Sequence, residues 1–413
     1  MASCCDVPGL MPVELAMEKI WQTIQPLTET EILPLTQLVG RVLAEDICSP
    51  IDVPGYDNSA MDGYALCTED LKKHHKLKQI GKSYAGNPFK GSVAQGQCVR
   101  IMTGACIPHG VDAVVMQENA LAENGMIQIQ TPVKPGEAIR RRGEDICQGQ
   151  KVLSKGHKVS AVDVGLLASI GVTKVPVFRF VKVAIFSTGD ELYQPGETLP
   201  DGCIYDSNRF ALQALLHQVG MQVIDLGVIE DDPDSIRNAF LQADQQADVV
   251  ITSGGVSVGE ADFTREILEQ LGEIDFWKLA IKPGKPLAFG RLPNSYFFGL
   301  PGNPVSSMVT FHQIALPSLQ WLSGKTPSPR TRLKARASKA FKKRPGRTDF
   351  QRGIYIQDNQ GNLSVSPLSN QSSGVLSSFY QANCYVVLEN ERGHVAEGEN
   401  VTIELFDSLL NAI

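Results

Sequence analysis

A glycine- and serine-rich stretch followed by an acid is the first feature of the sequence that points to chemistry. It runs from Ile251 to Phe263 as ITSGGVSVGEADF, directly after Val249 and Val250. The apolar lead predicts a buried strand, and the glycines and serines predict a loop that brings backbone amides and hydroxyls close to a ligand. With Asp262 following, this pattern is typical of a site that holds a phosphate or its metal in an open α/β sheet.

Three further loops bring similar residues to the same place. STGDEL follows a predicted strand at 181–186, EDD follows one at 221–229, and PGNP follows one at 296–300. Because the carboxyl ends of parallel strands converge in one crevice, we expect these loops to share a site with the first. In the last of them, Asn303 predicts an N-cap and Pro304 the first helical residue, so that the helix start presents free amides to an anion.

Carboxylates and lysines give this crevice both signs of charge. Glu191, Asp231 and Asp262 suit a hard cation such as Mg²⁺, which binds one or two carboxylates together with ligand phosphates. Taken singly, Asp231 and the acid after it are better explained as caps of the helix that begins at Pro233. The neighbouring loops shift the balance toward a site.

The segment WKLAIKPGKP supplies the positive charge through Lys278, Lys282 and Lys285. A stiff Pro/Gly turn holds ammonium groups at a fixed separation and favours an oxyanion ligand, although a solvated turn is the alternative. Acids for a cation and lysines for an anion indicate phosphoryl or oxyanion chemistry. The sequence has no GxxxxGK[ST] loop and no GxGxxG after a strand, which excludes ordinary P-loop ATPases and Rossmann dehydrogenases.

The elements around these loops predict a multidomain α/β protein. Strands alternate with helices at 207–220, 232–247 and 261–272, which indicates a doubly wound, three-layer α/β/α domain. Residues 77–153 lack helical periodicity and predict a β-rich second domain, and residues 331–413 predict a small all-β domain. Further amphipathic helices are expected at 13–24 and 160–170.

Composition narrows the class of protein. The 413 residues carry a net charge of -7, which argues against a general nucleic-acid binder. No apolar run is long enough for a membrane span, and the first residues lack a secretory signal, so we expect a cytoplasmic protein. The nine cysteines form no C-x-x-C pair, and the histidines have no zinc spacing. Nine basic residues between Arg330 and Arg347 partly alternate with apolar ones, which favours a solvated strand over a nucleic-acid patch.

A turn-rich segment, VPGYDNSAMDGYAL at 53–66, sets large residues among successive turns. It is either a functional loop or a surface Ω-loop packed on its own aromatic residues. In the β-rich region, IRRRGEDI brings three arginines together on a predicted strand. Only Arg140 and Arg142 can then share a face, because neighbouring strand residues point to opposite sides.

A series of segments along the chain identifies a resemblance: PGYDNSAMDGYA, RIMTGA, AVVMQE, IRRRGEDI, FSTGDEL, YDSN, TSGGVSVGEADF, KPGKP, GLPGNPVSS and DFQRG. In this order they closely resemble the MoeA (gephyrin E-domain-like) family of molybdopterin molybdenumtransferases, over nearly the whole chain. The resemblance implies an elongated homodimer with an N-terminal helix (10–29), a linking domain (30–48 and 150–180), a β-rich domain (49–149), a MogA-like α/β domain (181–326) and a C-terminal β-barrel domain (327–413).

The reaction that the resemblance implies is insertion of molybdate into adenylated molybdopterin, with release of AMP and with Mg²⁺ as cofactor. It further implies contact with a MogA-type adenylyltransferase and with molybdoenzyme-maturation proteins, and no nucleic-acid or membrane partner. The alternatives are an adenylyltransferase of the MogA type and a non-enzymatic scaffold of the same fold. The intact acid motifs argue against a scaffold, and the PGYDNSAMDGYA and RIMTGA segments argue against the single-domain MogA type.

Individual roles follow from the same resemblance. The positions expected to matter for catalysis are Asp62, Thr103, Glu191, Asp231 and Asp262, and those expected to hold metal are Asp231, Asp262 and Glu191. Those expected to bind molybdate or another anion are Lys278, Lys282, Lys285 and Arg352. Those expected to bind substrate or nucleotide are Ser187, Thr188, Gly189, Ser253, Gly254, Gly255, Pro301, Gly302, Asn303 and Pro304, with Arg140 and Asp145 contributed by the partner subunit. Ser372 and Ser373 have no fixed alignment to the family.

Overall fold

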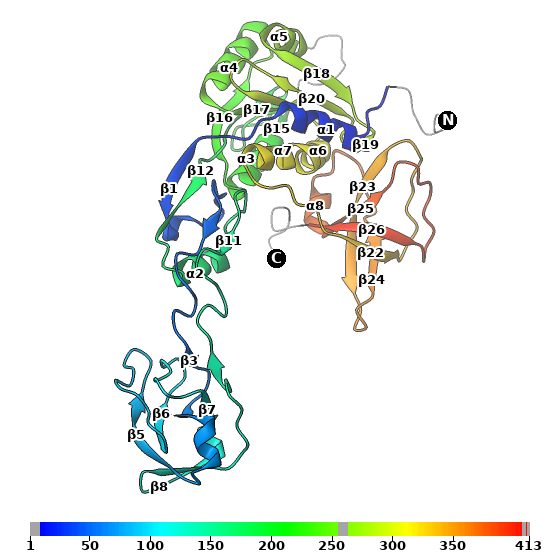
Figure 1. The fold of residues 1–413 in the computed structure, drawn as a ribbon. Helices are drawn as coiled ribbons and strands as arrows, with labels where there is room; N and C mark the ends of the chain where they lie inside the picture. The colour runs from blue at the N-terminus through cyan, green and yellow to red at the C-terminus, as the bar shows by residue number, and fades with distance from the viewer. Residues whose placement is uncertain (1–8, 255–262, 407–409, 411–413) are drawn as a thin grey trace, which may run out of the picture.

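The computed structural model describes residues 9–254, 263–406 and 410. Figure 1 shows an extended molecule in which a β-rich domain lies at one end and is joined through a linking domain to the rest of the chain. At the other end, an α/β domain and a small C-terminal β domain lie side by side. Within the described residues, no helix is both long and apolar enough to cross a membrane.

A six-stranded sheet with the order β16-β13-β17-β21-β20-β18 forms the centre of the α/β domain. Its strands are β13 (Lys182–Thr188), β16 (Gln222–Ile229), β17 (Val249–Ser253), β18 (Glu273–Lys278), β20 (Pro286–Arg291) and β21 (Tyr296–Leu300). The first four in space are parallel to one another, as the alternation of strands and helices predicts. At the other edge, β20 runs antiparallel to β21, and β18 runs antiparallel to β20. Short connections, which cannot make a crossover, account for that antiparallel edge.

Helices cover both faces of this sheet, since successive strand residues face opposite cores. In β13, Val183 and Ile185 face one core, whereas Ala184 and Phe186 face the other. The first core is covered by α1, α3, α6 and α7, and the second by α4 and α5. The bounds are α1 (Val13–Thr23), α3 (Ser207–Gln218), α4 (Pro233–Gln246), α5 (Phe263–Leu271), α6 (Pro304–Thr310), the π-helical turn η4 (Phe311–Ala315) and α7 (Leu316–Leu322).

The linking domain is built from two segments, one on each side of the β-rich domain in the sequence. Its elements are β1 (Thr30–Pro34), η1 (Leu35–Gln37), β2 (Ile47–Cys48), β11 (Lys151–Leu153), α2 (Ala161–Ser169) and β12 (Lys174–Phe178). β1 pairs with β12 and β2 with β11, both antiparallel. A capping box between Ser160 and Asp163 begins α2 at the predicted position. The chain therefore passes twice between the β-rich domain and the rest.

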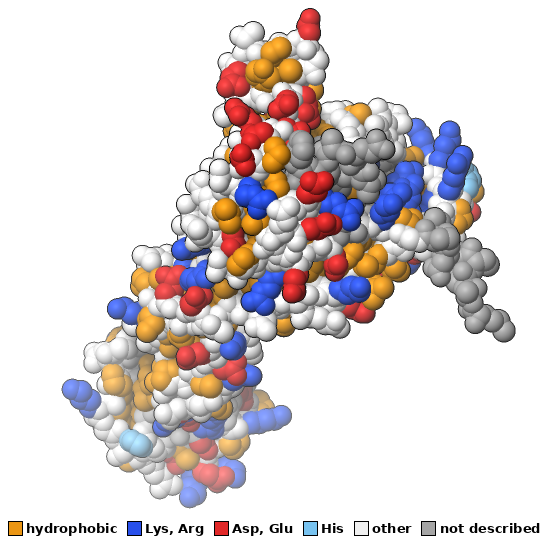
Figure 2. All heavy atoms as spheres, turned by 90° about the horizontal axis from the view of Figure 1, so that it is seen from above, with side chains coloured by type: hydrophobic (Ala, Val, Ile, Leu, Met, Phe, Trp, Pro, Cys, Tyr) orange, Lys and Arg blue, Asp and Glu red, His pale blue; other side chains and the backbone are white. Residues whose placement is uncertain are grey.

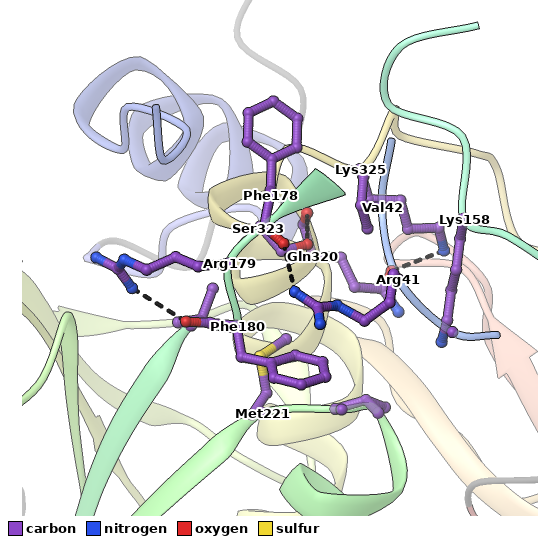
Figure 3. Close-up of a pocket in the computed structure, with 14 residues that line it drawn as sticks. Arg41, Val42, Lys158, Phe178, Arg179, Phe180, Met221, Gln320, Ser323 and Lys325 are labelled. Atoms are coloured by element: carbon purple, nitrogen blue, oxygen red, sulfur yellow. Dashed lines mark hydrogen bonds between the residues drawn. The ribbon is translucent and has the colours of Figure 1, made fainter. Parts of the chain in front are cut away.

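Arg41 lies within the linking domain, close to the point where the chain enters the α/β domain (Figure 3). Its side chain is almost fully buried, donates a 2.8 Å hydrogen bond to the carbonyl oxygen of Phe178, and lies with Cζ 3.8 Å from the ring centroid of Phe180. The neighbouring Arg179 forms a bidentate ion pair with Asp248, at 2.7 and 2.8 Å. Arg179 thus ties the end of the linking domain to the α/β domain, whereas Arg41 stabilises the linking domain itself.

The β-rich domain contains a six-stranded sheet with the order β7-β4-β6-β5-β9-β8 and a short β3–β10 pair. Its elements are β3 (Asn58–Ser59), β4 (Gly63–Leu66), η2 (Thr68–Lys72), β5 (Leu77–Ser83), β6 (Gln97–Ile101), β7 (Ala113–Met116), η3 (Gln117–Asn119), β8 (Ala120–Glu123), β9 (Met126–Ile129) and β10 (Ile139–Arg140). The predicted lack of long helices is confirmed.

The C-terminal domain is a small barrel. Its sheet has the order β19-β23-β24-β22-β26-β25, and the further pairing of β23 with β25 closes it. Its elements are β19 (Ile281–Lys282), β22 (Arg332–Ala337), β23 (Thr348–Gln357), β24 (Leu363–Pro367), α8 (Ser377–Gln381), β25 (Cys384–Leu388) and β26 (Asn400–Leu405). β19 comes from the lysine-rich turn between β18 and β20, so that turn joins the α/β domain to the barrel.

Candidate functional site

The carboxyl ends of β13, β17 and β21 meet at one edge of the sheet, and this place is called the crevice below. The chain order of the parallel strands reverses between β13 and β17, and ligands of open α/β sheets bind at such a switch point. Gly254 follows β17 with φ of +100°, and its amide donates to the carbonyl oxygen of Leu300 at 3.1 Å. A Cβ at this position would lie 3.3 Å from the carbonyl oxygen of Thr188, so glycine permits the close approach of three strand ends.

Asn208, near the start of α3, ties two of these strand ends together. Its Nδ2 donates to Ser253 Oγ and to the carbonyl oxygen of Gly302, both at 2.7 Å. Asn208 belongs to the YDSN segment, but the sequence alone predicts no role for it. The one feature of the sequence that could have indicated this role is an amide side chain at the start of a helix that follows a strand. The same pattern is typical of a helix cap.

Ser187 and Thr188 were expected in the loop after β13, and this expectation is wrong. Both are the last residues of β13 and are buried. The hydroxyl of Ser187 has no hydrogen-bond partner among the residues that the structure describes, nor has that of Thr252 in the adjacent strand. Buried hydroxyls without partners are rare and favour a polar ligand or water at the crevice floor.

The start of α6 differs from the prediction in one respect. Asn303 occupies the N-cap position and Pro304 is the first helical residue, but the Asn303 side chain makes no capping hydrogen bond. The amide of Val305 donates to the carbonyl oxygen of Ser373 at 3.0 Å, so this amide is not free for an anion. The contact brings a segment of the C-terminal domain to the crevice.

Arg352, predicted to bind an anion, lies beside the same segment. It is 1% exposed, and its guanidinium donates to Ser378 Oγ and to the carbonyl oxygen of Ser372, both at 3.1 Å. Burial lowers the pKa of Arg352, and no carboxylate pairs with it among the described residues. The side chain is held inside the barrel, close to the segment that contacts α6.

Acids cluster on one side of the crevice. The pKa of Asp231 is raised by burial and by the negative charges of Asp190, Glu191 and Asp232. Asp232 itself caps α4 by accepting from the amides of the next turn, which confirms the capping alternative for this residue. Within 9–254 and 263–406, no three acids, histidines or cysteines are arranged as a complete metal site.

Gly255 and Asp262 lie outside the described residues. Gly189 adopts φ of +145°, and a Cβ there would meet the Glu191 carboxylate at 2.6 Å, so the glycine keeps that carboxylate close to the end of β13. Pro301 and Gly302 follow β21 directly and stand beside Gly254.

The lysine turn packs against α6. All three ammonium groups, of Lys278, Lys282 and Lys285, are exposed, and Lys282 Nζ lies 3.7 Å from the carboxylate of Asp349 in the barrel. A Cβ on Gly284 would meet Thr310 Oγ1 at 2.3 Å, so the turn lies directly on the helix. The turn is therefore fixed between two domains, unlike a freely solvated loop.

Asp62 and Thr103 come together in the β-rich domain. The amide and the hydroxyl of Thr103 both donate to Asp62 Oδ1 at 2.7 Å, and these bonds lower the pKa of Asp62. In the same PGYDNSAMDGYA loop, Tyr56 and Met61 are exposed while Tyr64 is buried in β4. The loop is not an Ω-loop packed on its own aromatic residues.

The three arginines do not share a strand, so the prediction that Arg140 and Arg142 share a strand face is wrong. β10 ends at Arg140, which is exposed. The residues after Arg140 form a turn, in which the side chain of Arg141 donates to Asp57 and that of Arg142 donates to Asp52, both at 2.6 Å. Asp145, like Arg140, is exposed.

The predicted site residues therefore fall into two groups. The crevice and the lysine turn belong to the α/β and C-terminal domains, whereas Asp62, Thr103, Arg140 and Asp145 belong to the β-rich domain. Figure 1 places the β-rich domain at the opposite end of the molecule, beyond the linking domain. Within one chain in this arrangement, the two groups do not meet.

A doubly wound α/β domain with a polar crevice at its switch point, flanked by a β-rich domain and a barrel, defines a MogA-like multidomain class. Residues 11–171 match the MoeA N-terminal region (domain I and II), residues 184–321 a probable molybdopterin binding domain, and residues 334–406 the MoeA C-terminal region (domain IV). The chain belongs to the MoeA family.

Relatives and solved structures agree with that assignment. A molybdopterin molybdenumtransferase from Haemophilus influenzae is 48% identical over 403 residues, which cover 97% of this chain and 100% of that protein. A gephyrin from Dictyostelium discoideum is 32% identical, covering 98% of this chain and 63% of the gephyrin. The crystal structure of a molybdopterin biosynthesis MoeA protein from Pyrococcus horikoshii has a TM-score of 0.85 at 31% identity, covering 96% of this chain and 100% of that one.

Proposed function

We propose that this protein is a molybdopterin molybdenumtransferase that inserts molybdate into adenylated molybdopterin and releases AMP. The observation that carries the proposal is the 48% identity, along almost the whole chain, to a protein of that name. The charges support it chemically, because acids lie at the crevice and exposed lysines lie in a turn that is fixed on α6, the helix that begins at the crevice. Both signs of charge are needed to hold a phosphoanhydride and an oxyanion together.

The crevice would hold the nucleotide end of the substrate. The absence of a side chain at Gly302 would let a phosphate approach the backbone, and Asn208 ties its loop to the end of β17. The buried hydroxyl of Ser187 is a further polar contact at the crevice floor. Water attack on the phosphoanhydride would then yield AMP and the pterin phosphate, with one of the nearby carboxylates orienting the water.

We further propose Mg²⁺ as the cofactor. The donor set fits, because Asp231, Asp190 and Glu191 offer oxygen ligands and because desolvation, together with the charges of its acidic neighbours, raises the pKa of Asp231. When bound, Mg²⁺ would neutralise phosphate charge. The described acids do not complete a metal site by themselves, which suits a cation that also binds substrate phosphates and water.

We also propose that the active form is a homodimer in which each crevice is completed by the β-rich domain of the second subunit. The separation of the two groups of site residues within one chain supports this (Figure 1). Asp62 and Thr103 are pre-arranged at the far end of the molecule, where only another copy can bring them to a crevice. An isologous dimer would form two such sites by symmetry.

Single-turnover AMP release tests the function. Purified protein with adenylated molybdopterin, Mg²⁺ and molybdate should release AMP and yield a cofactor that activates an apo-molybdoenzyme. Formation of adenylate from molybdopterin and ATP at a comparable rate would favour the MogA-type alternative. Tight binding of the substrate without turnover would favour a scaffold.

A further inference from the structure

Three loops meet at one end of the β-rich sheet. Asp62 precedes β4, Thr103 follows β6, and Gln117 follows β7. Because β4 runs antiparallel to both β6 and β7, its start lies beside the ends of the other two strands. The segments SAMDGYA, RIMTGA and AVVMQE supply these loops. The third segment contains no residue of the site described above.

The backbone of the Asp62 loop is held closely against β7. A Cβ on Gly63 would lie 1.8 Å from the carbonyl oxygen of Val115, so glycine is needed for β4 to begin at this distance from β7. The amide of Gln117 donates to the carbonyl oxygen of Asp62 at 3.1 Å. Because Thr103 holds the carboxylate from the other side, the Asp62 loop is fixed between the other two loops.

Arg100, the first residue of RIMTGA, joins the Asp62 loop to the loop after β7. Its Nη1 donates to the carbonyl oxygen of Gly63 at 3.1 Å, and its Nη2 donates to Oε1 of Gln117. Its Cζ lies 5.0 Å from the ring centroid of Tyr64. One guanidinium therefore bridges two loops, and its planar fork can serve both acceptors at once.

Arg100 also brings a positive charge to two carboxylates. Hydrogen bonds from Thr103 lower the pKa of Asp62, and the charge of Arg100 lowers it further. Hydrogen bonds from its own amide and from Gln117 lower the pKa of Glu118, where the charge of Arg100 acts in the same direction and that of Asp62 opposes it. Among the described residues, Arg100 from β6 and Glu118 from η3 are thus the charged neighbours of Asp62.

The surface of the β-rich domain mixes both signs of charge. In Figure 2, where this domain lies farthest from the viewer, Lys and Arg side chains are interspersed with Asp and Glu side chains over the visible face. Arg100 itself is only partly exposed. Its effect on Asp62 therefore comes from particular contacts and not from a broad positive surface.

We propose that Arg100 is a positioning residue for Asp62. By joining the carbonyl oxygen of Gly63 to the side chain of Gln117, it fixes the carboxylate that the β-rich domain presents to the crevice of the second subunit. The inference rests on the proposed function, because Asp62 acts there only if two subunits share a site. A group that is held in place before the substrate binds needs no reorganisation during the reaction. Arg100 thus acts through Asp62 and need not touch the substrate.

The kinetic test compares Arg100→Gln with Lys82→Gln, which removes the same charge from an exposed residue opposite Arg100 on the neighbouring strand β5. With adenylated molybdopterin, molybdate and Mg²⁺, Arg100→Gln should lower kcat for AMP release about fivefold, with KM within about twofold of wild type. The acid limb of its pH–rate profile should shift to higher pH, because Asp62 loses a positive neighbour. Lys82→Gln should behave as wild type.

Arg100→Lys separates the charge from the fork. It keeps the positive charge but offers a single ammonium in place of a planar pair of donors, so it should retain the wild-type acid limb. Its kcat should lie between those of wild type and Arg100→Gln. This variant also keeps the test decisive if Arg100→Gln does not fold.

The ionisation of Asp62 can be measured without turnover. In protein with isotope-labelled aspartate carboxyl carbons, the Asp62 resonance, assigned by its loss in Asp62→Asn, should titrate at higher pH in Arg100→Gln than in wild type or Lys82→Gln. Absence of AMP release by the wild type would defeat the proposed function, whereas this titration would still decide whether Arg100 acts on Asp62. Three results would overturn the inference: an unchanged titration in Arg100→Gln, an equal change in Lys82→Gln, or a loss of activity through KM alone.

Discussion

The acids of the crevice and the acid of the β-rich domain are in opposite electrostatic situations. Asp231 lies among other carboxylates, and its pKa is raised by burial and by Asp190, Glu191 and Asp232. Asp62 accepts two hydrogen bonds from Thr103, and its pKa is lowered. The first group is destabilised as an anion until a cation arrives, whereas the second is stabilised as an anion by its own neighbours. This difference fits the proposal that the first group binds a cation and that the second is a carboxylate kept ionised by its own neighbours.

The largest effect should come from removing the carboxylate of Asp231. Asp231→Asn should lower single-turnover AMP release by at least about 100-fold, since it removes a proposed ligand of Mg²⁺. Asp234→Asn, three residues along on α4 and exposed, is the matched control and should retain activity. Wild-type rates in both variants would remove Asp231 from the site.

The thermal stability of Asp231→Asn tests whether Asp231 serves the site or the fold. A folded-state pKa above the unfolded value stabilises the fold below the unfolded pKa, and this contribution is lost as pH rises through the raised pKa. Asp231→Asn should therefore keep or raise the Tm at neutral pH while losing activity. Mg²⁺ should raise the Tm of wild type more than that of Asp231→Asn. A Tm well below wild type would show that Asp231 serves the fold instead.

The Asp62 side of the comparison is tested by Thr103→Val, with Thr103→Ser as the control that keeps the hydroxyl. Without the hydroxyl bond, the pKa of Asp62 moves up toward its ordinary value. If ionised Asp62 is needed, the acid limb of the pH–rate profile should shift to higher pH, with a loss of about 10-fold at the optimum. Identical profiles for the valine and serine variants would contradict this role.

Several parts of this site could be predicted from the sequence. Strand–loop–helix alternation located the ends of β13, β17 and β21, because parallel strands must converge at one edge. The capping of α4 and α2 was also predictable from local sequence. The sequence could not show that the amide of Val305 binds Ser373, because that contact joins two domains.

Other differences have the same cause. The composition of residues 140–142 predicts a strand. In the structure, Asp52 and Asp57, which are distant in sequence, bind the side chains of Arg142 and Arg141, and the segment forms a turn. Likewise, the lysine turn lies within the α/β domain in sequence but adds β19 to the barrel sheet. Local patterns predict elements, whereas partners that are distant in sequence decide how those elements end.

A smaller effect is expected at Asn208, which positions the crevice loops without touching the proposed acids. Asn208→Asp keeps the shape but loses both donated hydrogen bonds, so AMP should bind about 10-fold more weakly by titration calorimetry. Gln213→Glu, on the same helix, is the matched control and should bind normally. An Asn208→Asp variant with wild-type AMP affinity would exclude a positioning role.

The smallest effect is expected in the linking domain, which lies between the β-rich domain and the α/β domain. Arg41→Ala removes the hydrogen bond to Phe178, the contact with Phe180 and the ion pair with Glu31, so unfolding should become easier by about 1–2 kcal/mol in urea. Lys158→Ala, which removes an exposed lysine from the same pocket (Figure 3), should leave stability unchanged. Equal stability of all three proteins would show that Arg41 does not stabilise the linking domain.

Mixing two inactive variants tests the shared site most directly. Asp62→Ala and Asp231→Ala chains, unfolded together and refolded, should form dimers of which about half are mixed, each with one intact site. AMP release should then recover to about a quarter of the wild-type rate, although each variant alone is inactive. Recovery occurs only if Asp62 of one chain serves the crevice of the other. Mixed dimers with no activity above the separate variants would contradict a site built from two subunits.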